Sequence, residues 1–166
     1  MYLVTGGAGF FGSVLVQKLL GAGNNVVCFD VNVPKFEHPN LLVVTGDIRD
    51  GHAIRKALRG VKTVFHAVAQ VPIAKNRDLF WSVNRNGTQS LLEASLAHNI
   101  ERLVYISSSA IYGVPDRCPI TTLTDKKPLE DYGRAKLAGE ELCKEYRLKG
   151  LSCSIVRPRT ILGCGR

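Results

Sequence analysis

Long hydrophobic runs, cysteine pairs and aromatic residues are all scarce in this sequence. No apolar run approaches the roughly 18 residues that a membrane helix needs, so we predict no transmembrane segment and no membrane partner. The first residues, Met1–Gly6, show neither the basic nor the apolar region of a signal peptide, and we expect a cytoplasmic protein. The five cysteines form no Cys-x-x-Cys pair, which favours a reducing compartment. The four histidines share no ligand spacing with them, so we predict no metal site.

Acidic residues are also in the minority, because 22 Lys and Arg face 14 Asp and Glu and give a net charge of +8. A basic balance of this kind suits nucleic acids, anionic membrane surfaces or acidic small molecules. The basic residues are scattered, however, and no aromatic residues interleave with them as a single-strand platform requires. We interpret the charge as a solvated basic surface that also attracts phosphorylated ligands, and we predict no nucleic-acid partner.

Short β-branched runs alternate with helical stretches along all 166 residues, and no linker divides the chain. The expected strands are Tyr2–Thr5, Val26–Asp30, Leu41–Thr45, Lys62–His66, Arg102–Ser107 and Leu151–Arg157. The expected helices are Phe10–Leu20, Asp50–Arg59, Asp78–His98 and Glu130–Lys149. Apolar strands alternating with helices are typical of a parallel sheet covered on both faces. We predict one α/β domain over residues 1–166, a doubly wound, Rossmann-like parallel sheet with strand order 3-2-1-4-5-6.

A glycine-rich turn separates the first strand from the first helix. Gly6, Gly9 and Gly12 fit Gly-x-x-Gly-x-x-Gly, and Gly-x-Gly-x-x-Gly starts at Gly7. Glycine permits a tight turn, leaves the backbone open to a pyrophosphate, and lets the helix pack closely on the strand. The N–H groups and dipole of the helix N-terminus then favour phosphate. A glycine-rich turn without a ligand is the alternative interpretation.

Acidic residues end the second strand and follow the third. Asp30 lies 18 residues past Gly12, where a carboxylate would accept hydrogen bonds from ribose hydroxyls and repel a 2′-phosphate. This position indicates NAD rather than NADP, although Asp30 could also be a simple strand-end cap. In this topology Asp47 and Ile48 lie beside the adenine. Alternatively, Asp47 is the N-cap of the helix that begins near Asp50.

A tyrosine and a lysine share one helix face. Tyr132 and Lys136 stand at i and i+4, a spacing that chance alone can produce. Their helix lies between the fifth and sixth strands, and the fifth strand ends in Ser107, Ser108 and Ser109. These serines would lie at the carboxyl edge of the sheet, where doubly wound proteins bind ligands.

Together these motifs resemble the extended short-chain dehydrogenase/reductases, and most of all the NAD-dependent epimerase/dehydratase group that acts on nucleotide sugars. The sequence Ile111-Tyr112-Gly113 is similar to that family, as is His66-Ala67-Val68-Ala69 in the loop near the nicotinamide ribose. Asn84 matches the family's helix asparagine. From the residues alone, His66 could also be a satisfied strand-end histidine, and Asn84 a polar residue facing solvent.

The resemblance implies a UDP-glucose 4-epimerase-like enzyme with NAD as cofactor and a nucleotide-sugar substrate. Tyr132 would be the general acid/base, Lys136 would lower the pKa of its phenol, and Ser108, with Ser109 as the alternative, would bind the reacting oxygen. The implied cofactor-binding residues are Gly6, Gly9, Phe10, Phe11, Gly12, Asp30, Asp47, Ile48, His66, Ala67, Val68, Ala69, Asn84, Ser107, Tyr132 and Lys136.

The resemblance also leaves alternatives. Family members are usually about twice as long, so the chain resembles a fragment whose substrate domain is largely absent. A 3β-hydroxysteroid-dehydrogenase-like or reductase-like enzyme, or a non-catalytic NAD-binding module, would share these motifs. Ser109 and Ala110 occupy the places where dehydratases carry acidic residues, which weakens that interpretation. Relatives commonly dimerise through two long helices, here Asp78–His98 and Glu130–Lys149, so we expect a homodimer.

Overall fold

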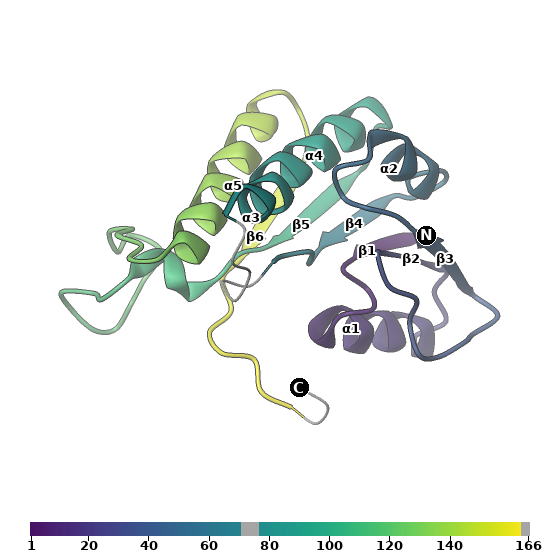
Figure 1. Ribbon diagram of the computed structural model, residues 1–166, viewed down its shortest axis with the longest axis horizontal. Helices are drawn as coiled ribbons and strands as arrows, with labels where there is room; N and C mark the ends of the chain where they lie inside the picture. The colour runs from purple at the N-terminus through teal and green to yellow at the C-terminus, as the bar shows by residue number, and fades with distance from the viewer. Residues whose placement is uncertain (71–76, 164–166) are drawn as a thin grey trace.

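A six-stranded parallel sheet forms the centre of the protein (Figure 1). The computed structural model describes residues 1–70 and 77–163. The strands lie in the order β3-β2-β1-β4-β5-β6, which confirms the predicted topology. Their bounds are β1 Tyr2–Thr5, β2 Val26–Asp30, β3 Leu41–Thr45, β4 Thr63–His66, β5 Arg102–Ile106 and β6 Cys153–Val156.

Helices cover both faces of the sheet. In Figure 1, α1 lies on one face, and α2, α4 and α5 lie on the other. Their bounds are α1 Phe10–Gly21, α2 Gly51–Ala57, α3 Arg77–Trp81, the π-helix η1 Ser82–Gly87, α4 Thr88–Ala97, the 3-10 helix η2 Ser109–Tyr112 and α5 Asp131–Leu148. Within the described ranges, no helix combines the length and apolar character that a bilayer crossing requires.

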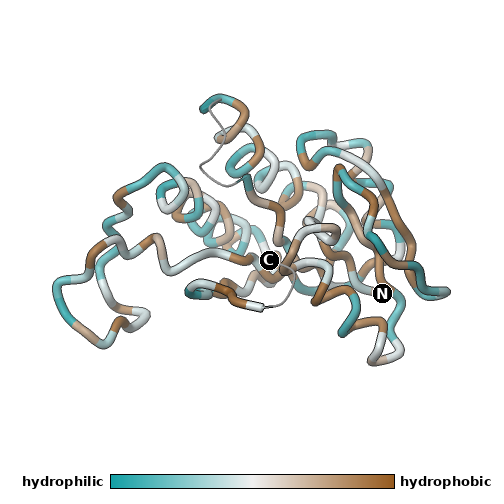
Figure 2. The backbone as a smooth tube through the Cα atoms, turned by 60° about the horizontal axis from the view of Figure 1, so that its bottom comes forward, coloured by the Kyte–Doolittle hydropathy of each residue, from teal (hydrophilic) through white to brown (hydrophobic). Residues whose placement is uncertain are grey.

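The two faces carry separate hydrophobic clusters. The smaller one joins α1 to the sheet through Val16 and Leu20 packed with Val4 and Val26. The larger one lies under α2, α4 and α5, and its members come from all six strands as well as those helices. Figure 2 shows hydrophobic stretches along the strands and mixed hydropathy along the helices, as expected when a sheet is buried between helical layers.

The stretch expected as one helix, Asp78–His98, contains a widened turn. The chain continues from α3 through six π-helical residues of η1 into α4, so the predicted helix exists but its interior differs. Isolated π segments frequently occur at functional sites. Here the segment contains Asn84, whose side chain is buried and contacts a loop near the cofactor-binding motifs.

Candidate active site and cofactor cleft

The glycine turn after β1 has no room for side chains. Gly6 has φ +72°, in the left-handed region that favours glycine. A Cβ atom on Gly12 would lie 1.9 Å from the carbonyl oxygen of Gly6, so the first turn of α1 packs directly on the end of β1. Gly9 is the N-cap of α1 and therefore provides no capping side chain.

The N-terminus of α1 is consequently available to an anion. The first turn contains no acidic residue, and the backbone N–H groups of Phe10, Phe11 and Gly12 donate to no atom of the described residues. Free N–H groups at the positive end of a helix dipole form an anion site. The turn thus fits the pyrophosphate of a dinucleotide by its backbone geometry.

Asp30 lies beside this turn at the carboxyl end of β2. Its Oδ2 accepts a hydrogen bond from the Ala8 N–H at 3.1 Å, and its Oδ1 accepts one from the Asn32 N–H at 3.0 Å. These bonds fix the carboxylate at a cavity of about 430 Å³, and each oxygen keeps a lone pair for another donor. The cavity is lined by Gly6, Gly9, Phe29, Asp30, Val31, Asn32, Gly46, Asp47, Ile48, Arg49, Ala67, Val68, Ala69, Gln70, Leu79 and Val83.

Asp47 and Ile48 line the same cavity. Asp47 Oδ2 forms an ion pair with Arg49 at 2.6 Å, and the hydrogen bond from Arg49 lowers the pKa of the Asp47 carboxyl. Asp50, not Asp47, is the N-cap of α2, because its side chain accepts from the N–H groups of the second and third residues after it. Ile48 is buried against Gly87, where any Cβ would collide with its side chain.

The His66 side chain lies in the core rather than on a cavity wall. Thr88 donates its hydroxyl to the Asn84 carbonyl at 2.8 Å, so it accepts from His66 Nε2 at 2.9 Å. The Thr5 hydroxyl then donates to His66 Nδ1 at 2.7 Å. Burial lowers the pKa of His66 to about 3, so the ring is neutral. The residue matches the satisfied strand-end histidine of the sequence alternatives, and a direct contact with the cofactor stays a prediction.

Asn84 holds the loop that follows β4. Its Oδ1 accepts from the Gln70 N–H at 2.9 Å, and its Nδ2 donates to the Gln70 carbonyl at 3.1 Å. This two-point contact fixes the end of the Ala67–Ala69 segment, which lines the cavities. The solvent-facing alternative for Asn84 is therefore wrong. The Gln70 Oε1 atom is buried and has no hydrogen-bond partner among the described residues.

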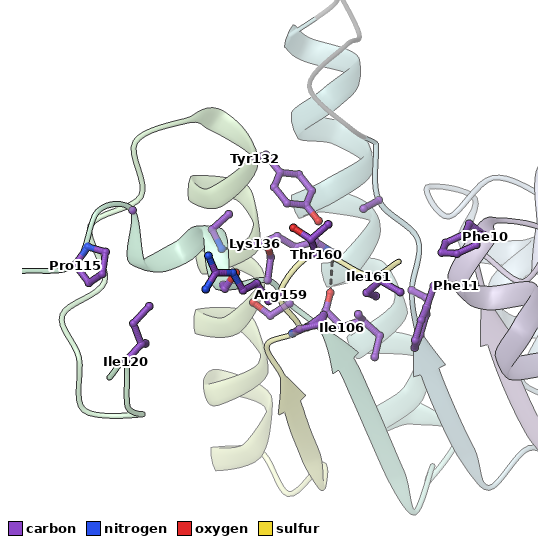
Figure 3. Close-up of a pocket in the computed structure, with 18 of the residues that line it drawn as sticks. Phe10, Phe11, Ile106, Pro115, Ile120, Tyr132, Lys136, Arg159, Thr160 and Ile161 are labelled. Carbon is purple, nitrogen blue, oxygen red and sulfur yellow. Dashed lines mark hydrogen bonds between the residues drawn. The ribbon is translucent and has the colours of Figure 1, made fainter. Parts of the chain in front are cut away.

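A larger cavity of about 810 Å³ contains the predicted catalytic residues (Figure 3). Burial raises the pKa of Tyr132, while a hydrogen bond with the Ser108 side chain opposes that shift. Lys136 Nζ donates to the Ile106 carbonyl at 2.7 Å and lies 5.9 Å from the centre of the Tyr132 ring. Burial lowers the pKa of Lys136 to about 8. The structure therefore brings Ser108, Tyr132 and Lys136 together.

The serine run divides by environment. Ser108 contacts Tyr132, and its hydroxyl also accepts from the Ala110 N–H at 3.1 Å. It is therefore the N-cap of η2, just after the carboxyl end of β5. The Ser107 hydroxyl instead donates to Glu140 Oε1 at 2.7 Å and is buried. Ser109 begins η2 and also lines the cavity. The contact with the phenol favours Ser108 over Ser109 as the partner of the reacting oxygen.

A buried charged network behind the cavity escaped the sequence analysis. Glu140 is fully buried, and both of its oxygens accept from Arg157 at 2.8 Å. Arg157 also donates to the Tyr112 hydroxyl at 2.7 Å. Tyr132, Lys136 and Glu140 stand at every fourth residue and therefore share one face of α5. This spacing is the sequence signal that could have identified Glu140 as part of the site.

The cavity wall also includes a segment that the sequence analysis left unassigned. Pro158, Arg159, Thr160 and Ile161 follow β6 and line the cavity, and the Pro158 carbonyl accepts from the Ser109 N–H at 2.9 Å. Figure 3 shows this segment crossing in front of the carboxyl end of the sheet. In the described parts of the chain, no three His, Cys, Asp or Glu side chains gather where they could hold a metal ion.

Comparison with known proteins places this geometry in a family. The sequence model of the "NAD dependent epimerase/dehydratase family" matches residues 2–166. The uncharacterized protein y4nG of Sinorhizobium fredii is 56% identical over 99% of the chain and 42% of its own length. A UDP-glucose 4-epimerase of Streptomyces lividans is 35% identical over 99% of the chain and 53% of its length. A decarboxylating sterol-4-alpha-carboxylate 3-dehydrogenase of Mus musculus is 30% identical over 96% of the chain and 45% of its length. The chain thus spans about half the length of these relatives.

Solved structures agree in fold and cofactor. A short-chain dehydrogenase/reductase superfamily protein of Agrobacterium tumefaciens with bound NAD has a TM-score of 0.89 and 35% identity, over 95% of this chain and 48% of the other. MoeE5 in complex with UDP-glucuronic acid and NAD has a TM-score of 0.86 and 34% identity, over 94% of this chain and 53% of the other. The predicted cofactor, NAD, is confirmed at the level of the family. The chain belongs to the NAD-dependent epimerase/dehydratase family.

Proposed function

We propose that this chain binds NAD and performs proton transfer in an oxidoreductase of nucleotide sugars, similar to a UDP-glucose 4-epimerase. The observation that carries the proposal is the meeting of Ser108, Tyr132 and Lys136 in one cavity at the carboxyl edge of the sheet. A binding module would need the residues that hold the cofactor, such as the glycine turn and Asp30. It would not need the Tyr132 phenol to contact a serine hydroxyl in the same cavity.

The cofactor would lie across the two cavities. The free N–H groups at the start of α1 would bind the pyrophosphate, and Asp30 would accept from the adenosine ribose. Asp47 and Ile48 would contact the adenine, and the Ala67–Ala69 segment would line the path towards Lys136. When bound, NAD supplies hydride chemistry at the carbinol carbon of the substrate.

The chain's own residues would handle the proton and the oxygen. Ser108 would hold the substrate hydroxyl by a hydrogen bond, and Tyr132 would take its proton as general base or return it as general acid. Because the pKa of a free phenol is near 10, Tyr132 requires stabilisation of its phenolate at neutral pH. The charged form of Lys136 provides it through its short distance to the ring. The Ile106 carbonyl keeps that ammonium in place.

Two relatives support the nucleotide-sugar substrate, one named a UDP-glucose 4-epimerase and the other crystallised with UDP-glucuronic acid. A sterol dehydrogenase also resembles the chain, so a steroid-type hydroxyl is the second candidate substrate. Ser109 and Ala110 stand where dehydratases place acidic residues, which favours the epimerase or dehydrogenase outcome. The homodimer through α4 and α5 stays a prediction.

The experiment measures reduction of bound NAD by nucleotide sugars in Tyr132→Phe and in the unaltered chain. Loss of the phenolic proton acceptor should lower the single-turnover rate by about 10²–10⁴-fold while NAD binding persists. Tyr2→Phe is the matched control, because Tyr2 lies at the amino end of β1, away from the cavity. If Tyr132→Phe reduced NAD as fast as the unaltered chain, Tyr132 would not be the acid/base. If the unaltered chain bound both NAD and the nucleotide sugar without reducing NAD, the non-catalytic module would be correct.

A further inference from the structure

The described lining of the larger cavity carries positive charge only. Its described lining residues include two cations, Lys136 and Arg159, and no aspartate or glutamate. Lys136 is occupied by the Ile106 carbonyl. The Arg159 side chain, by contrast, is exposed and forms no hydrogen bond or ion pair with any described residue. Arg157, two positions earlier, is instead paired with both oxygens of Glu140.

Arg159 lies on the substrate side of the catalytic residues. In Figure 3, Phe10 and Phe11 of the glycine turn stand at one end of the cavity, and Pro115 and Ile120 stand at the other. Arg159 lies beside Lys136 and towards Pro115 and Ile120. The pyrophosphate site proposed at the start of α1 is therefore at the opposite end, and the cofactor would leave this arginine free.

A guanidinium presents two parallel N–H donors that match a carboxylate, and it keeps its charge at any physiological pH. We propose that Arg159 binds a carboxylate of the substrate. This carboxylate is attached to the carbon adjacent to the one whose hydroxyl gives its proton to Tyr132. The substrate class is then a nucleotide-linked uronic acid rather than a neutral sugar. This inference rests on the proposed function, because it assumes that a nucleotide sugar enters the cavity.

The chemistry of such a substrate agrees with the charge of the cavity. In a hexuronic acid the carboxylate is attached to C5, the carbon adjacent to the one that carries the 4-hydroxyl. One molecule therefore presents both groups to the single cavity that Tyr132 and Arg159 line. A neutral sugar has a hydroxymethyl group at that point and gains no charge-assisted bond from Arg159. The absence of acidic residues from the described wall removes the repulsion that would oppose a carboxylate.

The test compares two ligands that differ only in this group. The NAD-saturated chain is titrated by calorimetry with UDP-glucuronic acid and with UDP-glucose. We expect UDP-glucuronic acid to bind at least about tenfold more tightly, which corresponds to about 1.4 kcal/mol. Arg159→Gln should remove this preference and leave the affinity for UDP-glucose unchanged. Arg159→Lys should retain part of the preference, because lysine keeps the positive charge but lacks the two parallel N–H donors of the guanidinium.

Arg102→Gln is the matched control. It changes the net charge equally, but Arg102 begins β5 at the opposite edge of the sheet. In addition, the Arg159 side-chain N–H resonance, assigned by its loss in Arg159→Gln, should shift with UDP-glucuronic acid and not with UDP-glucose.

Three outcomes would overturn the inference. An equal loss of affinity for both ligands in Arg159→Gln would assign the arginine to the shared diphosphate. Binding of both ligands without preference would remove the carboxylate site and leave the proposed function intact. Failure of both ligands to bind the NAD-loaded chain would overturn the nucleotide-sugar substrate itself, and with it this inference.

Discussion

Single residues decide whether the candidate site can exist. The turn at Gly6–Gly12 works because the Gly12 backbone approaches the Gly6 carbonyl more closely than any side chain would allow. Lys136 can stabilise a phenolate because α5 places its ammonium beside Tyr132. His66 is used differently, since both of its ring nitrogens are consumed by threonine hydroxyls within the core. Its chemistry therefore bears on stability rather than on proton transfer.

The buried His66 ring should make the protein sensitive to mild acid. The pKa of this residue is about 3 in the folded chain and near 6.5 when unfolded, so the unfolded state binds more protons below pH 6.5. Stability is unaffected by this group above that value and falls as the pH drops from 6.5 towards 3. When the pH is lowered from about 7.5 to about 5.5, the protonation of His66 in the unfolded chain should lower the unfolding free energy by about 1.4 kcal/mol.

Urea unfolding at these two pH values measures the effect, with His66→Gln as the comparison. The variant is less stable at the higher pH, because it loses part of the threonine network, but its stability should depend less on pH. Carboxylates titrate mainly below this window, so they contribute little to the difference. An equally steep loss in His66→Gln would show that another group causes it.

At the scale of elements, the cavity depends on the ends of two strands being held against one helix. Glu140 on α5 joins Ser107, after β5, to Arg157, after β6, and Arg157 in turn joins Tyr112 of η2. The carboxylate is fully buried, and the hydrogen bonds from Arg157 and Ser107 outweigh its desolvation and lower the pKa of Glu140. Removal of one partner from such a pair leaves an uncompensated charge.

Arg157→Met should therefore destabilise the protein strongly. We expect a loss of about 3–5 kcal/mol of unfolding free energy, because the Glu140 carboxylate would remain buried without its countercharge. Arg134→Met, which removes an exposed ion pair with Asp131 on the same helix, should cost about 0–1 kcal/mol. Chemical denaturation of the three proteins makes the comparison. Equal effects of the two substitutions would mean that the network contributes no more than a surface pair.

The elements themselves were largely predictable, whereas the contacts between distant ones were not. Apolar runs predicted all six strands, and the alternation of strands with helices predicted their order through the right-handed crossovers of a doubly wound sheet. The π-helical turn at Ser82–Gly87 was missed, since it accompanies Asn84 reaching the Gln70 backbone. Glycine spacing and the Tyr132–Lys136 spacing are local signals and predicted two parts of the site. The Glu140–Arg157 pair joins positions 17 apart through folding alone.

The whole molecule presents a cofactor cleft more completely than a substrate site. The residues expected to hold the pyrophosphate and adenosine ends of NAD lie along the carboxyl ends of β1, β2, β3 and β4. The cavity that contains Ser108, Tyr132 and Lys136 lies at the ends of β5 and β6. The chain matches about half of each relative's length. The proposed substrate therefore depends on the cavity that contains Tyr132, whereas the NAD cofactor is supported by the glycine turn and the cavity beside Asp30.

The central claim is that the cleft beside Asp30 binds NAD and rejects a 2′-phosphate. Calorimetric titration of the unaltered chain with NAD and NADP tests it directly, with Asp30→Ala as the comparison. We predict that NAD binds at least about tenfold more tightly than NADP, a difference of about 1.4 kcal/mol. Asp30→Ala should reduce this ratio of affinities, mainly because it weakens the binding of NAD. A folded chain that bound neither cofactor, or bound NADP as tightly as NAD, would contradict the account.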